Sequence, residues 1–231
     1  AYAFNYCKGL TTVEMSTTIT TIGKVAFSYC SNLTTINFKG NIRNIGYSNF
    51  SDSEWYNRCS DGAIYIDKVL YKYKGTMASN TSFAVKDGTV QIGPNAFKDQ
   101  TGLTSVTFPE SLENIGYMGF YGCSGLTSVI IPQNVQTIDD NAFYNCSNLE
   151  TITFQAQQPN IGYGAFYGTK WYTNLPDGLN YINNVAYRYK GTMPANTSII
   201  IQNGTKSISS ECFSDCRNLS SITIPSGVTY I

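Results

Sequence analysis

Apolar residues recur along the chain with a period of 23 residues. An Ala-Phe pair or a near match marks each unit, and its phenylalanine falls at Phe4, Phe27, Phe50, Phe97, Phe120, Phe143, Phe166 and Phe213. Most steps are 23 residues and two are 47. The positions also recur after 116 residues, so the chain is nearly two copies of a block of four units. Repeats of this size are typical of a solenoid in which each unit forms one coil.

Each unit reads A-F-x-x-C-x-x-L-T-x-I-x-F-P-x-x-V-x-x-I-G, and its pattern changes halfway. In the first half, Phe, Cys and Leu share one face of a tight, helix-like turn. In the second half, apolar and polar residues alternate, which predicts a strand. We expect Val106 and Phe108 to point inward, and Ser105 and Thr107 to point to solvent. The other predicted outward pairs are Thr12 and Glu14, Thr35 and Asn37, Ser128 and Ile130, Thr151 and Thr153, and Ser221 and Thr223.

Gly or Asn precedes the repeat leucine, as at Gly9, Gly125 and Asn148. Because these residues tolerate positive φ, we expect a left-handed turn at this position. A second Gly, such as Gly116, closes most units at another tight corner. One unit cannot bury its apolar face alone, whereas stacked units cover each other and form a parallel sheet. Roughly ten coils at about 4.8 Å each predict a rod about 45–50 Å long.

Two long units, 50–96 and 166–212, interrupt the regular spacing. Their segments 61–77 and 177–193 are identical at 11 of 17 positions and alternate apolar with polar residues. The alternation surrounds a polar pair, Asp67-Lys68 or Asn183-Asn184, which predicts a β-hairpin in each unit. A Trp-Tyr pair precedes each hairpin, so the turn chemistry changes there.

The repeat resembles the BspA-like (Treponema-type) leucine-rich repeats of bacterial surface proteins, and residues 119–142 match this pattern especially well. The Y-K-Y-K-G-T-M segment is similar to a variant found in Bacteroides members of that family. The resemblance covers the whole chain. It implies an α/β solenoid, a right-handed leucine-rich-repeat superhelix with a parallel sheet on one side and two inserted hairpins. We expect one domain over 1–231, made of repeat blocks 1–118 and 119–231.

Composition excludes several classes of function. Fifteen basic residues balance fifteen acidic ones, so the chain has no electrostatic footprint for nucleic acid. No apolar run is long enough to span a membrane. Residue 1 is Ala with no leader after it, so we expect any secretion signal to be removed or to lie outside this piece. The resemblance implies export to an extracellular or cell-surface setting.

The sequence contains few side chains that could form a catalytic or metal site. The chain has no histidine, which removes the usual general base and every imidazole metal ligand. Asp61, Asp87 and Asp177 precede Gly as turn residues, and Asp139 takes a corner Gly position. We therefore expect no enzyme activity, no catalytic or metal site and no cofactor.

Five of the seven cysteines share the repeat position three residues after the phenylalanine: Cys7, Cys30, Cys123, Cys146 and Cys216. Stacking brings them close enough for disulfides, but Cβ vectors that run parallel and in register do not face each other. We expect free, buried thiols at these positions.

The hairpins concentrate tyrosine with basic residues, the kind of side chain that anchors binding surfaces. The candidate binding residues are Tyr65, Tyr71, Lys72, Tyr73, Lys74, Tyr181, Tyr187, Arg188, Tyr189 and Lys190. The alternative is that these rings only cover the flank of the solenoid. The predicted function is a binding or adhesion module that recognises a host or bacterial surface protein, or a glycan. The competing prediction is a structural spacer within a longer surface protein.

Overall fold

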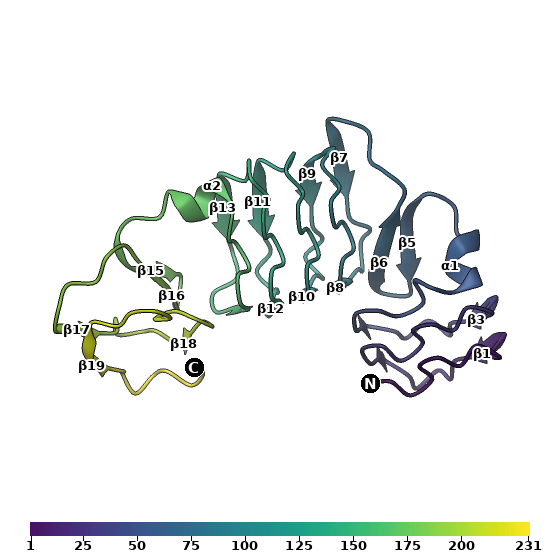
Figure 1. Ribbon diagram of the computed structural model, residues 1–231, viewed down its shortest axis with the longest axis horizontal. Coiled ribbons are helices and arrows are strands. Elements are labelled where there is room, and N and C mark those ends of the chain that lie inside the picture. Colours follow the sequence, from purple (N-terminus) through teal and green to yellow (C-terminus); the bar gives the residue numbers. More distant parts are fainter.

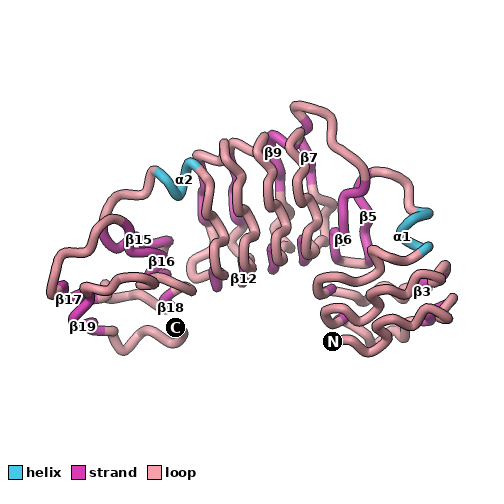
Figure 2. The backbone as a smooth tube through the Cα atoms, viewed as in Figure 1, coloured by secondary structure: helices cyan, strands magenta, loops and turns pink.

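The computed structural model describes residues 1–231 as a solenoid of about nine turns with coils of roughly 23 residues. Each ordinary coil contains a phenylalanine-bearing turn, a first strand, a loop and a short second strand at the corner of the coil. Figure 1 shows that the coils form an arch, and Figure 2 shows that turns and loops make up most of the backbone. The straight rod expected from even stacking is therefore wrong.

The first strands, which we call face strands, pair in parallel in three separate sheets. Between the coils of one sheet the register advances by one repeat, so that Ser128 pairs with Thr151. The sheets are β1–β3, β7–β9–β11–β13 and β17–β19. Their bounds are β1 Thr12–Glu14, β3 Thr35–Asn37, β7 Thr81–Ala84, β9 Leu103–Thr107, β11 Ser128–Ile131, β13 Thr151–Phe154, β17 Thr197–Ile200 and β19 Leu219–Thr223.

The face strands confirm the predicted register. Val106 is buried and Thr107 is exposed, as the alternation requires. Ile130 also faces solvent, although it is apolar. The other predicted outward residues are exposed, except Ser105, which is half-buried. Polar side chains therefore coat the outer surface of the arch, where Figure 1 shows β7, β9, β11 and β13.

The second strands, which we call corner strands, lie on the inner side of the arch (Figure 1). Each ordinary corner strand contributes two residues, of which the second is an isoleucine that points into the core. The bounds are β2 Thr21–Ile22, β4 Asn44–Ile45, β8 Gln91–Ile92, β10 Asn114–Ile115, β12 Thr137–Ile138, β14 Asn160–Ile161 and β18 Ser207–Ile208.

Both predicted hairpins form and are part of the corner sheets. Strands β5 (Gly62–Ile66) and β6 (Val69–Lys74) pair antiparallel, and so do β15 (Gly178–Ile182) and β16 (Val185–Lys190). The first turn residue takes positive φ, 51° at Asp67 and 47° at Asn183. Strand β6 also pairs with β8, and β16 with β18, in parallel. The second strand of each hairpin is thus the corner strand of its own coil.

Each of these strands separates two apolar cores. Val69 and Tyr71 of β6 pack in the N-terminal core, whereas Leu70 packs in the central core. In β16, Val185 and Tyr187 pack in the central core and Ala186 packs in the C-terminal core. An alternating strand normally has one solvent face. Here both faces are covered, because the strand stands between two stacks of coils.

The phenylalanine rings form a ladder through the core. The ring centroids of Phe97, Phe120 and Phe143 follow one another at 5.0 Å, and all three rings are fully buried. Each long unit lacks a phenylalanine at the position where the 23-residue period would place one. Tyr71 lies 6.1 Å from Phe50 on one side of the gap, and Tyr73 lies 6.2 Å from Phe97 on the other. Hairpin tyrosines therefore continue the ladder where the repeat phenylalanine is missing.

Two short helices, α1 (Glu54–Arg58) and α2 (Lys170–Thr173), begin after the phenylalanine of the long units. Ser53 Oγ accepts a hydrogen bond from the Tyr56 N–H, and Thr169 Oγ1 accepts one from Tyr172, so both residues are N-caps. In ordinary coils the same stretch forms consecutive tight turns, as predicted, but no helix. Neither helix has the length or apolar composition needed to cross a membrane.

The expected left-handed turn at the Gly or Asn before the repeat leucine is wrong. Positive φ occurs instead just before the cysteine position, as at Gly122 (71°) and Asn145 (57°). The Gly before the leucine has a different cause, close approach between backbones. A Cβ atom at Gly125 would lie 2.3 Å from the carbonyl oxygen of Thr101 in the preceding coil. Where Asn replaces Gly, as at Asn148, its amide donates to a carbonyl of the preceding coil.

The cysteines are free, and their burial follows the stacking. Cys30, Cys123 and Cys146 are buried as predicted, and the Cys146 thiol donates to the carbonyl of Phe120 at 3.0 Å. The burial expected for Cys7 and Cys216 is wrong, because Cys7 is exposed and Cys216 is half-buried. Both lie in the outermost coils, which are covered on one side only.

Gly125→Ala tests the steric origin of the repeat glycine. We expect a loss of about 1–3 kcal/mol in the free energy of unfolding, because the new methyl group would overlap the Thr101 carbonyl. Gly9→Ala is the matched control, since it changes the same repeat position with no atom within 4 Å. Urea unfolding of both variants measures the difference. Equal stability of the two variants would contradict the proposed cause.

Alkylation of the folded protein tests the thiol positions. Cys7 should react within minutes, whereas Cys123 and Cys146 should react only after denaturation because both are buried. Mass spectrometry of the unreduced digest identifies the labelled peptides. Recovery of a Cys123–Cys146 crosslink would contradict the free-thiol assignment.

Candidate binding surfaces

Tyr71 and Tyr187, two predicted binding residues, lie in the core. They are 4% and 5% exposed, so neither ring can contact a partner in the folded protein. The Tyr71 hydroxyl donates to the carbonyl of Asn49. Burial raises the pKa of both phenols above the usual value of 10.0. The alternating pattern correctly predicted the hairpin but not the covering of both faces.

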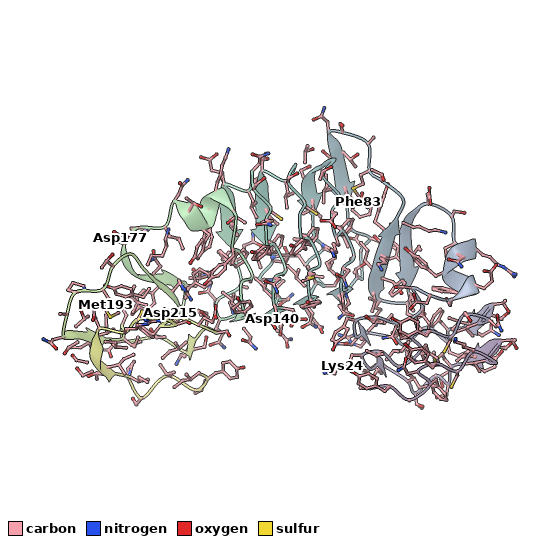
Figure 3. The ribbon with its side chains drawn as sticks, viewed as in Figure 1. Lys24, Phe83, Asp140, Asp177, Met193 and Asp215 are labelled. Carbon is pink, nitrogen blue, oxygen red and sulfur yellow. The ribbon has the colours of Figure 1, made fainter.

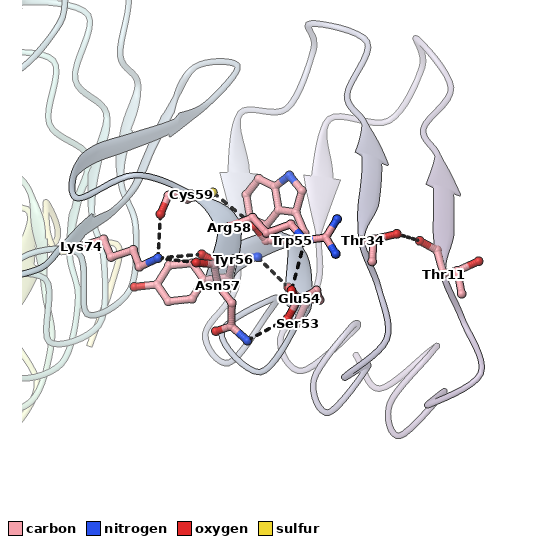
Figure 4. A network of polar contacts seen from close by, with 10 residues as sticks. All are labelled: Thr11, Thr34, Ser53, Glu54, Trp55, Tyr56, Asn57, Arg58, Cys59 and Lys74. Atoms are coloured by element: carbon pink, nitrogen blue, oxygen red, sulfur yellow. Dashed lines mark hydrogen bonds and ion pairs between the residues drawn. The ribbon is translucent and has the colours of Figure 1, made fainter.

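Lys74 and Lys190 hold the carbonyl end of the short helices. Lys74 Nζ donates to the carbonyls of Asn57 at 2.7 Å and Cys59 at 2.6 Å, and also contacts the Tyr56 carbonyl (Figure 4). Lys190 donates to Tyr172 and Thr173 in the same way. A cation at this end complements the helix dipole and satisfies carbonyls that the helix leaves free.

Lys72 and Arg188 also contact groups of the protein itself. Lys72 Nζ lies 3.2 Å from Ser51 Oγ, and burial lowers the pKa of this amine. The Arg188 guanidinium donates to the Glu211 carbonyl at 2.6 Å and lies 3.7 Å from the Glu211 carboxylate. These contacts join the hairpins to the neighbouring coils.

The remaining candidates, Tyr65, Tyr73, Tyr181 and Tyr189, are half-buried. The hydroxyl groups of Tyr65 and Tyr181 accept backbone hydrogen bonds from the next coil. Figure 1 shows the two hairpins at opposite ends of the central stack, so they do not form one site. Contact of a partner with their accessible edges stays a prediction.

A groove that the sequence analysis did not single out runs across the loops before β12 and β14. It has a volume of about 610 Å³, and its polar lining consists of Gln133, Asn134, Gln136, Gln155, Gln157 and Gln158. We call these six residues the amide groove. Five of the eight glutamines of the chain lie here. The signal available in the sequence was the concentration of glutamines in the same loop of two successive coils, although no two of them lie at equivalent repeat positions.

Most amides of the groove have no partner in the protein. Asn134 donates to the Glu110 carbonyl and Gln157 to that of Gln155, whereas the other four side chains make no hydrogen bond. All six residues are exposed. The donors and acceptors of the four unbonded side chains are therefore free to bind a ligand.

The bend of the arch joins the amide groove to both flanks. A neighbouring hollow shares Asn134 and Gln136 with it and is also lined by Arg43, whose guanidinium lies 2.7 Å from the Glu113 carboxylate. Nearby, the Tyr47 and Tyr117 rings lie 5.9 Å apart. On the other side, a pocket of about 210 Å³ shares Gln136 and Gln158 and reaches the C-terminal coils.

An acidic pair, Asp139 and Asp140, lies beside the far end of this surface. Burial, and then the charge of Asp140, raise the pKa of the Asp139 carboxyl. Asp140 Oδ1 accepts a hydrogen bond from the Tyr163 N–H at 2.7 Å, and Figure 3 shows Asp140 on the inner side of the arch. No three His, Cys, Asp or Glu side chains lie close enough together to hold a metal ion.

A family model described as the BspA type leucine rich repeat region matches the chain in six copies, over residues 1–60, 65–194 and 187–231. No curated protein sequence matches the chain.

Solved structures of leucine-rich repeat proteins are similar over most of the chain. A protein from Bacteroides ovatus is 24% identical, with a TM-score of 0.43, over 99% of this chain and 53% of its own. A protein of T. pallidum is 22% identical, with a TM-score of 0.44, over 74% of this chain and 70% of its own. A cell surface protein from Faecalibacterium prausnitzii is 21% identical, with a TM-score of 0.38, over 74% and 60%. The chain therefore spans about half the length of the Bacteroides ovatus protein.

The buried phenols predict a loss of stability in alkali. The folded state keeps Tyr71 and Tyr187 neutral, whereas the unfolded chain ionises them above pH 10.0. Their contribution to the free energy of unfolding is fully present below that pH. It is lost as the pH rises further, by about 1.4 kcal/mol per tyrosine for each pH unit. Urea unfolding at about pH 8 and pH 11 should show a smaller loss for a Tyr71→Phe, Tyr187→Phe variant than for the parent. Equal losses would contradict the burial of these rings.

Proposed function

Because the chain belongs to the BspA-type leucine-rich repeat family, we propose that it is a non-catalytic binding module at a bacterial cell surface or in the surrounding medium. Its partners are host or bacterial surface proteins, or glycans. The family supports a role in surface interactions, and one similar structure is of a cell surface protein. The observation that carries the proposal is the amide groove, in which four of the six exposed amide side chains make no hydrogen bond to the protein.

The proposed surface is built from the scaffold rather than added to it. The loops that present Gln136 and Gln158 lie between face strands and corner strands, and both kinds of strand are fixed in register by neighbouring coils. The coils therefore fix the backbone positions from which these side chains extend, so that binding orders side chains but not the loops that carry them. A structural spacer needs only the stacking of its coils and has no need of such a surface.

Contact through the hairpins is a second part of this proposal. It is limited to the half-exposed members of the predicted set, because Tyr71 and Tyr187 are buried. Tyr73 and Tyr189 are the positions to replace by alanine. Lys74 and Lys190 are unsuitable, since their removal would also destabilise α1 and α2.

A binding screen tests the proposed function. The folded chain is immobilised and exposed to purified host matrix proteins and to a glycan array, with the heat-denatured chain as control. We expect saturable binding of at least one probe to the folded chain, with a dissociation constant in the micromolar range, on the order of −8 kcal/mol. The absence of saturable binding to every probe would contradict the proposal and favour the spacer.

A further inference from the structure

We propose that the amide groove binds a neutral oligosaccharide. This inference rests on the proposed binding function and adds the location and the chemical class of the ligand. It is carried by the lining of the groove, by the lack of ionisable side chains in that lining, and by a pocket that extends it.

The lining matches a polyhydroxylated ligand. Each amide presents a carbonyl acceptor and an NH₂ donor, and each sugar hydroxyl can donate and accept as well. Gln133, Gln136, Gln155 and Gln158 keep both functions free, because none of their side chains bonds to the protein. Neighbouring hydroxyl groups of one sugar could therefore bond to neighbouring amides from two coils.

The same lining disfavours other ligand classes. Six of the seven residues around the groove carry amides, and Val135 is the only apolar one. A protein partner binds chiefly through buried aromatic and aliphatic anchors, for which this groove offers little apolar area. The lining of the groove itself offers a charged glycan no countercharge. The cations lie in the adjoining hollows: Arg43, which is paired with Glu113, and Lys68 on one side, and Lys206 on the other. The volume of about 610 Å³ lies within the usual range for small-ligand sites.

The groove extends toward the C-terminal coils, where a position equivalent to that of Gln91 carries a shorter residue. At the N-terminal bend, the Gln91 amide spans the gap between coils, accepting from the Ile45 N–H at 2.8 Å and donating to the Ile45 carbonyl at 3.4 Å. The residue 116 positions later is Ser207, which is much shorter. Its hydroxyl is buried with no partner. Ser207 lines the pocket of about 210 Å³ that shares Gln136 and Gln158 with the groove.

Tyr230 adds an aromatic side chain at this end. It lines the Ser207 pocket and is 55% exposed. Sugar rings present C–H groups on their faces, and an aromatic ring offers a flat apolar surface to them. The inner side of the arch thus combines amides for hydroxyl groups with one ring for a sugar face.

The test uses the whole chain and defined oligosaccharides. Maltohexaose, cellohexaose, mannohexaose and xylohexaose serve as neutral probes, and a heparin hexasaccharide serves as the charged probe. Each is titrated into the parent and into a Gln136→Ala, Gln158→Ala variant. Gln202→Ala is the matched control, because Gln202 is another exposed glutamine outside the groove. All the replaced side chains are exposed, so the variants should melt like the parent.

We expect at least one neutral probe to bind the parent. Loss of two amides should weaken that binding about tenfold or more, and Gln202→Ala should stay within about twofold of the parent. Ser207→Gln should weaken binding too while the melting temperature is kept or raised, because the longer side chain would fill the pocket as Gln91 does. Unchanged binding by Ser207→Gln would overturn the extension of the ligand into this pocket.

Other outcomes separate this inference from the proposed function. Binding of a matrix protein but of no neutral probe would overturn the ligand class and leave the binding function in place. Binding of a neutral probe with equal affinity by parent and double variant would overturn the location. Binding of the heparin probe alone would overturn the argument from charge. No binding to any protein or glycan would overturn both proposals.

Discussion

The fold depends on the spacing between parallel strands. Successive coils lie about 4.8 Å apart, and at this distance every side chain that points inward must be covered by its equivalent in the next coil. This explains why the phenylalanine rings stack, with centroids 5.0 Å apart from Phe97 to Phe143. It also explains the repeat glycines, since a Cβ atom at Gly125 would collide with the coil before it. The spacing between coils thus determines both which positions of the repeat are apolar and which require a small residue.

The long units satisfy the same requirement with different residues. The ring ladder would be interrupted where the phenylalanine spacing doubles, and Tyr71 and Tyr73 continue it on the two sides of β6. Because β6 stands between two cores, the stack changes direction there. This change of direction brings the Arg43 guanidinium to 2.7 Å from the Glu113 carboxylate. Arg43 precedes β4 and Glu113 precedes β10, and β6 and β8 lie between these two strands. The inner side of the arch is therefore a continuous surface that crosses coil boundaries.

The sequence predicted those features that depend on period alone. The repeat of the phenylalanines predicted the coil, and the alternation around Val106 predicted which residues face solvent. Features that depend on the neighbouring coil were not predictable in this way. The alternation around Tyr71 is compatible with one or two buried faces, and only the second core decides between them. Gly125 was interpreted through its own φ, whereas its cause is a carbonyl 24 residues earlier in the chain. The amide groove was missed because exposed glutamines in loops carry no pattern of their own.

The central claim is that the solenoid bends at the hairpin units, so that residues of separate coils share its inner surface. A photoreactive benzophenone amino acid at position 47 tests it directly. The bend places the Tyr47 ring 5.9 Å from that of Tyr117. A straight stack would separate β4 from β10 by three strand spacings, about 14 Å. After irradiation and digestion, mass spectrometry should identify a crosslinked peptide that contains Tyr117. Crosslinks confined to the coils adjacent to position 47 would contradict the account.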